Sequence, residues 1–292
     1  MITRGEVKLI VPYKLPVIGG NEVVGKIEAV GANVTQFSVG ERVFSRLPLD
    51  SIGAFAQYAA VDANAIAKVP PYLSDVQAAA IPLTALTVMQ AFELMQVKKG
   101  NTIFISGGTG GVGAMAIPLA KAKGLKVITN GSVENKERVL ALGVDRFIDY
   151  KTEDYTQTVA NVDYVLDTLG GQETEKQMTI MKKAGQLVSL KGMPNGAFAK
   201  RMGFTGLKRL LFSFAGRKFD KMAQKYGVTY NFIFVQANGA QLTEVAKLFT
   251  KLELKPSLDT VYAFSDVNAA LDKVANGRSR GKTVLDLQQG EK

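Results

Sequence analysis

The sequence predicts an α/β protein with a doubly wound parallel sheet and a second, smaller, β-rich domain. Three observations predict this fold. Strand and helix patterns alternate after residue 101, and a glycine-rich turn joins the first of these strands to its helix. Before residue 78, the apolar residues form short segments of the kind that is typical of strands. Since 292 residues suffice for two ordinary domains, we expect a β-rich domain over 1–77, an α/β domain over 78–255, and a return to the first domain over 256–292.

The β-rich part is predicted from short apolar segments separated by turns. Strands are expected at Glu22–Val30, Val39–Phe44 and Ala54–Val61. The residues from Ala78 to Met95 are almost all apolar or small, which predicts a mostly buried helix.

Six strands alternate with helices in the α/β part, which is typical of a parallel, doubly wound sheet. A short strand, a helix over Asp266–Ala275 and a strand over Lys282–Leu287 are expected to close the chain after Pro256. The six predicted strands are Thr102–Ser106, Lys126–Thr129, Arg146–Asp149, Tyr164–Asp167, Gln186–Leu190 and Thr229–Val235, and the predicted helices are Gly111–Lys123, Glu134–Leu142, Gln172–Lys183 and Gly239–Leu252.

The most informative segment is the glycine-rich turn after the first of these strands. Gly108, Gly110 and Gly113 have G-x-G-x-x-G spacing, between a buried strand and an apolar helix. Glycines allow the backbone to turn tightly and to approach a pyrophosphate, whose charge is stabilised at the helix N-terminus. We therefore predict a dinucleotide site formed by Gly108, Thr109, Gly110, Gly111, Val112 and Gly113.

The end of the second strand favours NADP(H) over NAD(H). NAD sites usually place a carboxylate there to bind the ribose 2′-hydroxyl. This chain has no carboxylate at that point and instead offers Asn130, Ser132 and Lys136, which suit a 2′-phosphate. Two alternatives stay open: Lys136 could lie on a solvated helix face, and Ser132 could be the N-cap of the helix.

The composition excludes several chemistries. The chain contains no cysteine and no histidine, so imidazole and thiolate metal sites, thiol nucleophiles and Ser-His triads are impossible. It has no apolar run long enough to span a membrane and no signal-peptide core at its start. The absence of disulfides fits a cytoplasmic protein, which is our expectation.

Several further segments, in the same order as in the family, resemble the medium-chain dehydrogenase/reductase superfamily, in its zinc-free quinone oxidoreductase and enone reductase branch. The resemblance implies a Rossmann domain and a GroES-like domain. The segments that carry it besides the glycine-rich turn are Gly19–Gly25, Val30–Val43, Ala80–Thr87, Leu142–Asp145, Val165–Gly171 and Gly281–Leu285.

The chain departs from the family pattern at two points. Zinc-containing members carry Gly-His-Glu where this sequence has Gly20, Asn21 and Glu22, so no zinc site is expected. Family members also have further residues before the segment that matches Arg4–Pro16, which implies a shortened N-terminus and an incomplete GroES-like domain.

The resemblance also implies additional cofactor-binding residues and a homodimer. Tyr150 is expected to join Ser132 and Lys136 around the adenosine phosphate. The residues expected around the nicotinamide end or the phosphates are Thr84, Leu190, Gly192, Phe234 and Lys282.

The expected activity is an NADPH-dependent, zinc-independent reduction of quinones or α,β-unsaturated carbonyl compounds. Such substrates need orientation more than a Lewis acid, because their own carbonyl spreads the charge that hydride delivery creates. No catalytic residue is assigned, although Tyr13, Asn21 and Tyr58 are of a type that could donate a proton.

The second hypothesis is a non-catalytic NADPH-binding module with a basic surface for nucleic acid or lipid. It rests on residues 196–228, which carry eight Lys or Arg against one Asp, in a chain of net charge +10. Because no nucleic-acid motif accompanies this charge, we expect no nucleic acid partner and interpret the segment as a solvated pair of amphipathic helices at a cleft mouth or a dimer contact.

Overall fold

The computed structural model describes residues 10–11, 13, 15–277 and 281–288. The chain divides into two compact units: Met1–Leu86 with Val235–Lys292 (unit 1), and Thr87–Phe234 (unit 2). The segment Arg4–Pro16, which suggested a shortened N-terminus, lies mostly outside the described residues.

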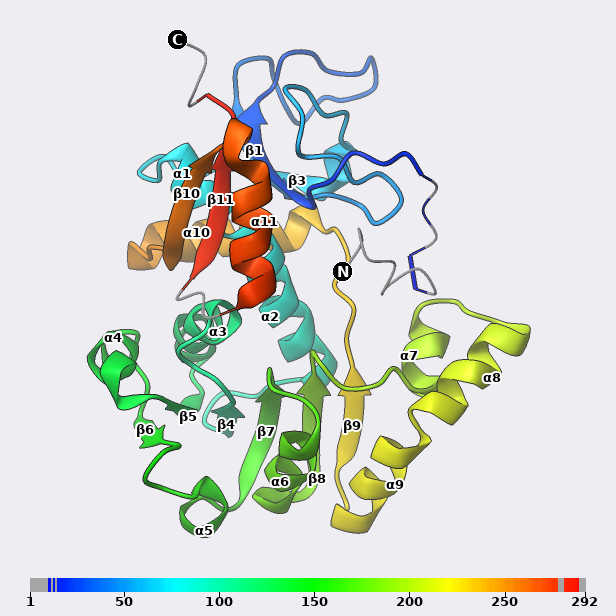
Figure 1. Ribbon diagram of the computed structural model, residues 1–292, viewed down its shortest axis with the longest axis vertical. Helices are drawn as coiled ribbons and strands as arrows, with labels where there is room; N and C mark the ends of the chain where they lie inside the picture. Colours follow the sequence, from blue (N-terminus) through cyan, green and yellow to red (C-terminus); the bar gives the residue numbers. More distant parts are fainter. Residues whose placement is uncertain (1–9, 12, 14, 278–280, 289–292) are drawn as a thin grey trace. The chain divides into compact units, whose positions relative to one another are not determined.

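Unit 2 contains the predicted doubly wound sheet (Figure 1). Its six strands lie in the order β6-β5-β4-β7-β8-β9, and every neighbouring pair is parallel. The central strands β4 and β7 are mostly apolar and mostly buried, as expected of a sheet covered on both faces. The strands are β4 (Thr102–Ile105), β5 (Lys126–Gly131), β6 (Arg146–Asp149), β7 (Val162–Asp167), β8 (Met181–Ser189) and β9 (Thr229–Phe232).

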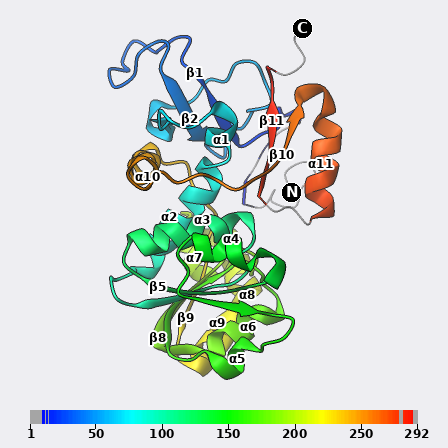
Figure 2. The ribbon, with the colours of Figure 1, turned by 90° about the vertical axis from the view of Figure 1, so that its left-hand side faces the viewer.

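The direction of winding reverses between β4 and β7, so the end of β4 is the point where ligands bind in sheets of this type. Right-handed crossovers then place helices on opposite faces; Figure 2 shows α3 and α4 on one face and α6 on the other. The helices associated with the sheet are α2 (Pro82–Met95, continuing from unit 1), α3 (Gly111–Ala122), the short η2 (Val133–Asn135), α4 (Lys136–Ala141), α5 (Tyr155–Thr158) and α6 (Gln172–Thr179).

Three helices interrupt the alternation before β9, where the sequence predicted helical spacing. They are α7 (Gly196–Arg201), α8 (Gly206–Ala215) and α9 (Arg217–Tyr226), beyond the β9 edge of the sheet (Figure 1). An aromatic cluster attaches them to the sheet: the ring centroid of Phe198 lies 5.8 Å from that of Phe212 and 5.1 Å from that of Phe232.

Unit 1 contains two small sheets. The first is antiparallel, in the order β1 (Glu22–Lys26), β2 (Arg42–Arg46), β3 (Ile66–Lys68), and the second pairs β10 (Leu258–Ala263) in parallel with β11 (Lys282–Asp286). The helical elements of this unit are η1 (Ala63–Ala65), α1 (Asp75–Ala79), the start of α2, α10 (Gly239–Leu252), η3 (Phe264–Asp266) and α11 (Val267–Asn276). The predicted boundary at residue 255 places α10 in the α/β domain, whereas its packing against β3 and η1 places it in unit 1.

The strand predicted at Ala54–Val61 is wrong. The N–H groups of Ala54 and Phe55 donate to the carbonyls of Gly20 and Gly19, and most of the segment after them is exposed. It pairs with no strand in the described part of the chain, and β2 pairs instead with the three residues of β3.

Two predicted helices are also corrected. The helix expected from Ala78 to Met95 is broken before Pro82, because proline has no N–H to continue the α1 ladder and instead opens α2 at its first position. The helix expected over Gln172–Lys183 ends at Thr179, and Met181 already begins β8.

Candidate functional site: a glycine loop at the sheet switch point

The glycine loop lies at the carboxyl end of β4, where the winding of the sheet reverses. The side chain of Asn130, in β5, accepts a hydrogen bond from the Gly107 N–H at 2.8 Å, and its backbone carbonyl accepts from the Gly108 N–H at 3.0 Å. On the other side, Thr168, after β7, donates its hydroxyl to the Ser106 carbonyl at 2.7 Å. The loop is therefore held by both strands that flank β4.

The glycines of the loop differ in what surrounds them. A Cβ atom on Gly108 would overlap the side chain of Thr129, with Thr129 Cγ2 2.8 Å away. A Cβ atom on Gly113 would overlap the Gly107 carbonyl oxygen and lie 2.5 Å from Gly108 Cα, so α3 packs directly on the loop. Gly111 has nothing within 4 Å of its Cβ position, so the loop is closely packed behind and open in front.

The open side of the loop presents the N-terminus of α3. The first hydrogen bond of this helix runs from the Ala114 N–H to the Gly110 carbonyl, and Gly110 provides no side-chain cap. The N–H groups of Gly111, Val112 and Gly113 precede that bond, and such groups are the donors that bind phosphates at helix N-termini. The chemistry and the space thus fit the pyrophosphate of a dinucleotide.

Arg138 is a loop contact that the sequence prediction missed. It lies in α4, and its Nη2 donates to the carbonyl oxygen of Thr109 at 2.6 Å. Nothing in the local pattern distinguishes it from a solvated helix cation, because the contact depends on how α4 packs against β6.

The residues predicted around the adenosine phosphate follow the ends of β5 and β6. Ser132 starts η2, and its hydroxyl makes no cap bond. Tyr150 is 59% exposed and donates its backbone N–H to the Gly131 carbonyl at 3.2 Å, which places it beside the end of β5. Lys136 is exposed and makes no ion pair with any residue that the structure describes. Glu134, the first carboxylate after β5, is paired with Lys151 at 2.9 Å.

A buried aspartate organises the ends of β7 and β8. Asp167 has no exposed surface, and its Oδ2 accepts hydrogen bonds from the hydroxyls of Thr174 at 2.6 Å and Ser189 at 2.7 Å. Its Oδ1 accepts from the N–H groups of Leu169 and Gly170 and from Gln177 Nε2. Five donors offset the cost of burying this charge, so Asp167 holds together the loops beyond β7 and β8.

Ser189 extends this network to the residues predicted near the nicotinamide. Its Oγ accepts the Gly192 N–H at 2.8 Å, and the Leu190 N–H donates to the Asp167 carbonyl at 2.9 Å. Phe234 is half-buried, two residues beyond β9. Within unit 2, the structure therefore places Leu190, Gly192 and Phe234 at the carboxyl ends of the strands, the same edge as the glycine loop.

The other two predicted residues belong to unit 1. Thr84 lies buried in the first turn of α2, and its hydroxyl donates to the Ala80 and Ile81 carbonyls at 3.2 and 3.1 Å. Lys282, in β11, forms an ion pair with Glu22, whose other oxygen accepts the Leu83 N–H at 2.8 Å. Glu22 therefore caps α2 and neutralises Lys282 at the same time.

A buried arginine lies opposite Glu22 in the β1–β2 ladder. Arg46 is 2% exposed, and this burial lowers its pKa to about 10, although the nearby charge of Glu22 acts to raise it. Arg46 Nε and Asn21 Oδ1 are both buried and have no hydrogen-bond partner among the described residues. Of the three possible proton donors, Asn21 is thus partly enclosed, whereas Tyr58 is 74% exposed.

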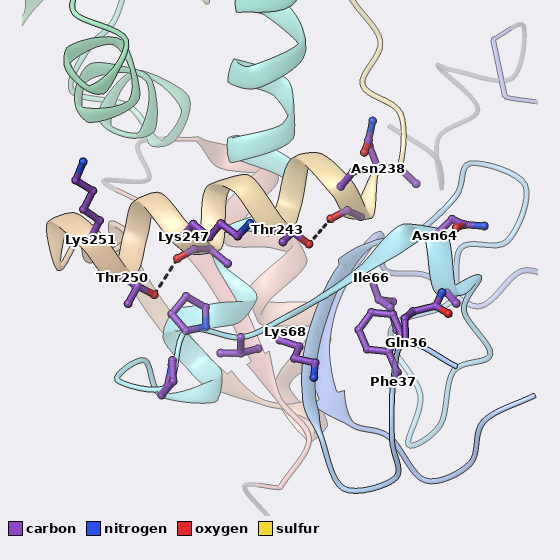
Figure 3. A pocket seen from close by; sticks show the side chains of 18 residues that line it. Gln36, Phe37, Asn64, Ile66, Lys68, Asn238, Thr243, Lys247, Thr250 and Lys251 are labelled. Atoms are coloured by element: carbon purple, nitrogen blue, oxygen red, sulfur yellow. Dashed lines mark hydrogen bonds between the residues drawn. The ribbon is translucent and has the colours of Figure 1, made fainter. Parts of the chain in front are cut away.

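Unit 1 also has a hollow of about 1120 Å³ between α10 and the β3 region (Figure 3). Lys68, Lys247 and Lys251 line it together with apolar residues such as Phe37 and Ile66. None of the predicted site residues lines it. Its cations do not converge, since Lys68 is paired with Glu41 and the Lys247 and Lys251 side chains point in different directions (Figure 3).

Over the described residues, no group of acidic side chains is arranged to hold a metal ion. No helix in the described part of the chain has the length and apolar character that a membrane span requires.

Comparison with known proteins agrees with the fold. Residues 1–71 match the alcohol dehydrogenase GroES-like domain, and residues 142–285 match the zinc-binding dehydrogenase family. The human mitochondrial NAD(P)H oxidoreductase RTN4IP1 is 30% identical over 283 residues, which is 94% of this chain and 71% of the relative. The tomato (Solanum lycopersicum) 2-methylene-furan-3-one reductase is 28% identical, over 93% of this chain and 64% of the relative. The structure of the Coxiella burnetii quinone oxidoreductase superimposes with a TM-score of 0.79 at 26% identity, over 99% of this chain and 84% of that one.

The fold and the relatives thus indicate an oxidoreductase with a nicotinamide cofactor. The chain belongs to the medium-chain dehydrogenase/reductase superfamily, in its zinc-free quinone oxidoreductase branch.

Proposed function

We propose that this protein is an NADPH-dependent oxidoreductase that delivers hydride to quinones or α,β-unsaturated carbonyl compounds without zinc. The observation that carries the proposal is the glycine loop at the β4–β7 switch point, open in front of Gly111 and closed behind by Gly113 and Gly108. The names of the tomato furanone reductase and the Coxiella quinone oxidoreductase support this class of hydride acceptor.

The residues of the chain would bind and orient the cofactor rather than activate the substrate. The N–H groups at the start of α3 would hold the pyrophosphate. Arg138 supports the glycine loop from α4, because it donates a hydrogen bond to the Thr109 carbonyl. When bound, NADPH would supply a hydride to an electron-poor carbon; the conjugated carbonyl would take up the negative charge, and a proton from water would complete the reduction. Since the chain has neither histidine nor cysteine, substrates that carry their own electron-accepting carbonyl are the ones that suit it.

Preference for NADPH is proposed from the charges after β5. Lys136 is exposed and free of ion pairs among the described residues, whereas the carboxylate of Glu134 is neutralised by Lys151. A 2′-phosphate could therefore pair with the Lys136 ammonium, although the exposed carboxylate of Glu137 lies next to it in the chain. Thr84 and Lys282 stay predictions as cofactor contacts, because their polar groups already bind Ile81 and Glu22.

The activity is tested by following NADPH oxidation with a panel of quinones and enones, with two controls: NADPH oxidation by saturated ketones, and NADP⁺ reduction by alcohols. We expect turnover with quinones or enones and none with the controls. A folded protein that binds NADPH by calorimetry and reduces no member of the panel would refute the enzyme hypothesis and favour the non-catalytic module.

The cofactor preference is tested with Lys136→Glu. We expect the Kd for NADPH to rise about tenfold or more, since a charge-assisted contact becomes a repulsion, and the Kd for NADH to change little. Lys123→Glu, at the far end of α3, is the matched control and should leave both values unchanged. Equal losses for both cofactors in Lys136→Glu would contradict the assignment of the 2′-phosphate to this residue.

We also propose the homodimer that the resemblance implies. Sedimentation equilibrium measures its mass, and a monomer at all concentrations would contradict it. A cytoplasmic location is proposed from the lack of cysteine, although the human relative carries a mitochondrial designation; microscopy of the tagged chain in its own cell decides between them.

A further inference from the structure

Helix α8 has two apolar faces, and only one of them is covered. Phe212 faces inward, with its ring centroid 5.5 Å from that of Phe204 and 5.8 Å from that of Phe198. Leu207, Leu210, Leu211 and Phe214 lie at i, i+3, i+4 and i+7, which places them on one stripe of the helix. They are 72%, 65%, 56% and 76% exposed. A soluble helix normally keeps such a stripe against the core, so this one is available to a partner.

The segment that carries the stripe, residues 196–228, is rich in basic side chains. Lys208 lies over the ring of Phe204, 3.7 Å from its centroid, and Lys225 is 3.7 Å from Glu175. Five other cations of the segment are exposed and make no ion pair with the described residues, namely Lys200, Arg209, Arg217, Lys218 and Lys221. Asp220 is the one acidic residue between 196 and 228, and it accepts a hydrogen bond from Asn195.

We propose that α8 and α9 dock onto an anionic phospholipid surface, with the leucine and phenylalanine stripe in the headgroup–acyl boundary and the cations on lipid phosphates and carboxylates. A helix with a bare apolar stripe and Lys or Arg beside it is the form that binds in the plane of such an interface. An anionic lipid surface accounts for both observations, because it binds the exposed apolar side chains of α8 and also the cations that have no ion pair among the described residues.

Other partners satisfy only one of them. A second copy of the chain, packed through the same segment, would bring the exposed cations of one protomer against those of the other, because a two-fold interface is self-complementary. A nucleic acid would use the cations but not four bare apolar side chains. Charge complementarity therefore favours the lipid surface.

The test is co-sedimentation of the full-length protein with phosphatidylcholine vesicles, with and without phosphatidylserine. We expect binding that requires phosphatidylserine and weakens with salt, since the screening length falls from about 10 Å at 0.1 M to about 3 Å at 1 M. Leu207→Glu/Leu210→Glu should weaken binding about tenfold or more, because it removes buried apolar area and adds repulsion. Leu271→Glu/Val274→Glu is the matched control, an exposed i, i+3 pair on α11, and should bind like the wild type.

Three results would overturn the proposal. The first is a wild type that does not sediment with phosphatidylserine vesicles. The second concerns the Leu207→Glu/Leu210→Glu variant: it either binds phosphatidylserine vesicles as well as the wild type does, or it is a monomer in sedimentation equilibrium where the wild type is a dimer. The third is tighter binding to a single-stranded oligonucleotide than to vesicles, unchanged in that variant. Thermal unfolding of each variant verifies that it is folded.

Discussion

The third glycine of the loop offers the sharpest test of the site geometry. In Gly113→Ala the new Cβ atom would overlap the Gly107 carbonyl oxygen and lie 2.5 Å from Gly108 Cα and 2.9 Å from Gly108 C. All three are backbone atoms, so no side chain can rotate away, and α3 must move off the loop. Overpacking of this kind costs about 1–3 kcal/mol. The corresponding fall in Tm is about 2–4 °C per kcal/mol for a protein of this size.

Gly111→Ala is the matched substitution at the same loop. Its Cβ atom would meet nothing within 4 Å, and alanine is favoured over glycine in a helix by about 0.5–1 kcal/mol. We expect equal or greater stability than the wild type, measured by urea unfolding. The added methyl group points into the open side of the loop, so the Kd for NADPH should rise about tenfold. Gly113→Ala should lose both stability and binding.

The reasoning fails if Gly113→Ala unfolds at the wild-type urea concentration, because the loop and α3 would then not be in contact. It also fails if Gly111→Ala binds NADPH like the wild type, because the pyrophosphate would then not occupy the open side.

Two further predictions concern the supports of the sheet. Partial burial acts to raise the pKa of Asp145, but hydrogen bonds from Lys121 Nζ and the Val127 N–H outweigh it and lower the pKa below the ordinary 3.8. A lowered carboxylate pKa stabilises the fold above the unfolded value and loses that contribution as the pH falls through the folded value. Asp145→Asn should therefore reduce the free energy of unfolding at pH 7 and flatten its decline below pH 4, and an unchanged acid profile would contradict this. Thr174→Val keeps the shape of the side chain but removes a donor to Asp167, so it should cost about 1.5–3 kcal/mol in urea unfolding; a loss below about 0.5 kcal/mol would show that Asp167 does not depend on it.

The loop and its flanking strand and helix could be predicted because their signals are local. A buried strand, a glycine spacing and an apolar helix occupy residues 102–122 without interruption, and the structure has β4 and α3 in those positions. Helix α10 has the predicted bounds Gly239–Leu252, since Asn238 caps its first turn by accepting the Gln241 N–H.

The pairing of strands could not be predicted from the local sequence pattern. Ala54–Val61 has the apolar composition of a strand, but a strand needs a neighbouring edge, and β2 pairs with Ile66–Lys68 instead. The contact of Arg138 with Thr109 and the pairing of Glu22 with Lys282 also join residues far apart in the chain.

The sequence by itself determined the class of fold, the position of the glycine loop and, through the absence of histidine and cysteine, the exclusion of imidazole and thiolate zinc sites. These properties depend on residue type and on spacing within one turn or one strand. The tertiary structure alone decided the strand order β6-β5-β4-β7-β8-β9, the closed and open sides of the loop, and the bare second face of α8. Each of these depends on which distant surfaces pack together, and packing is a property of the whole fold rather than of any segment.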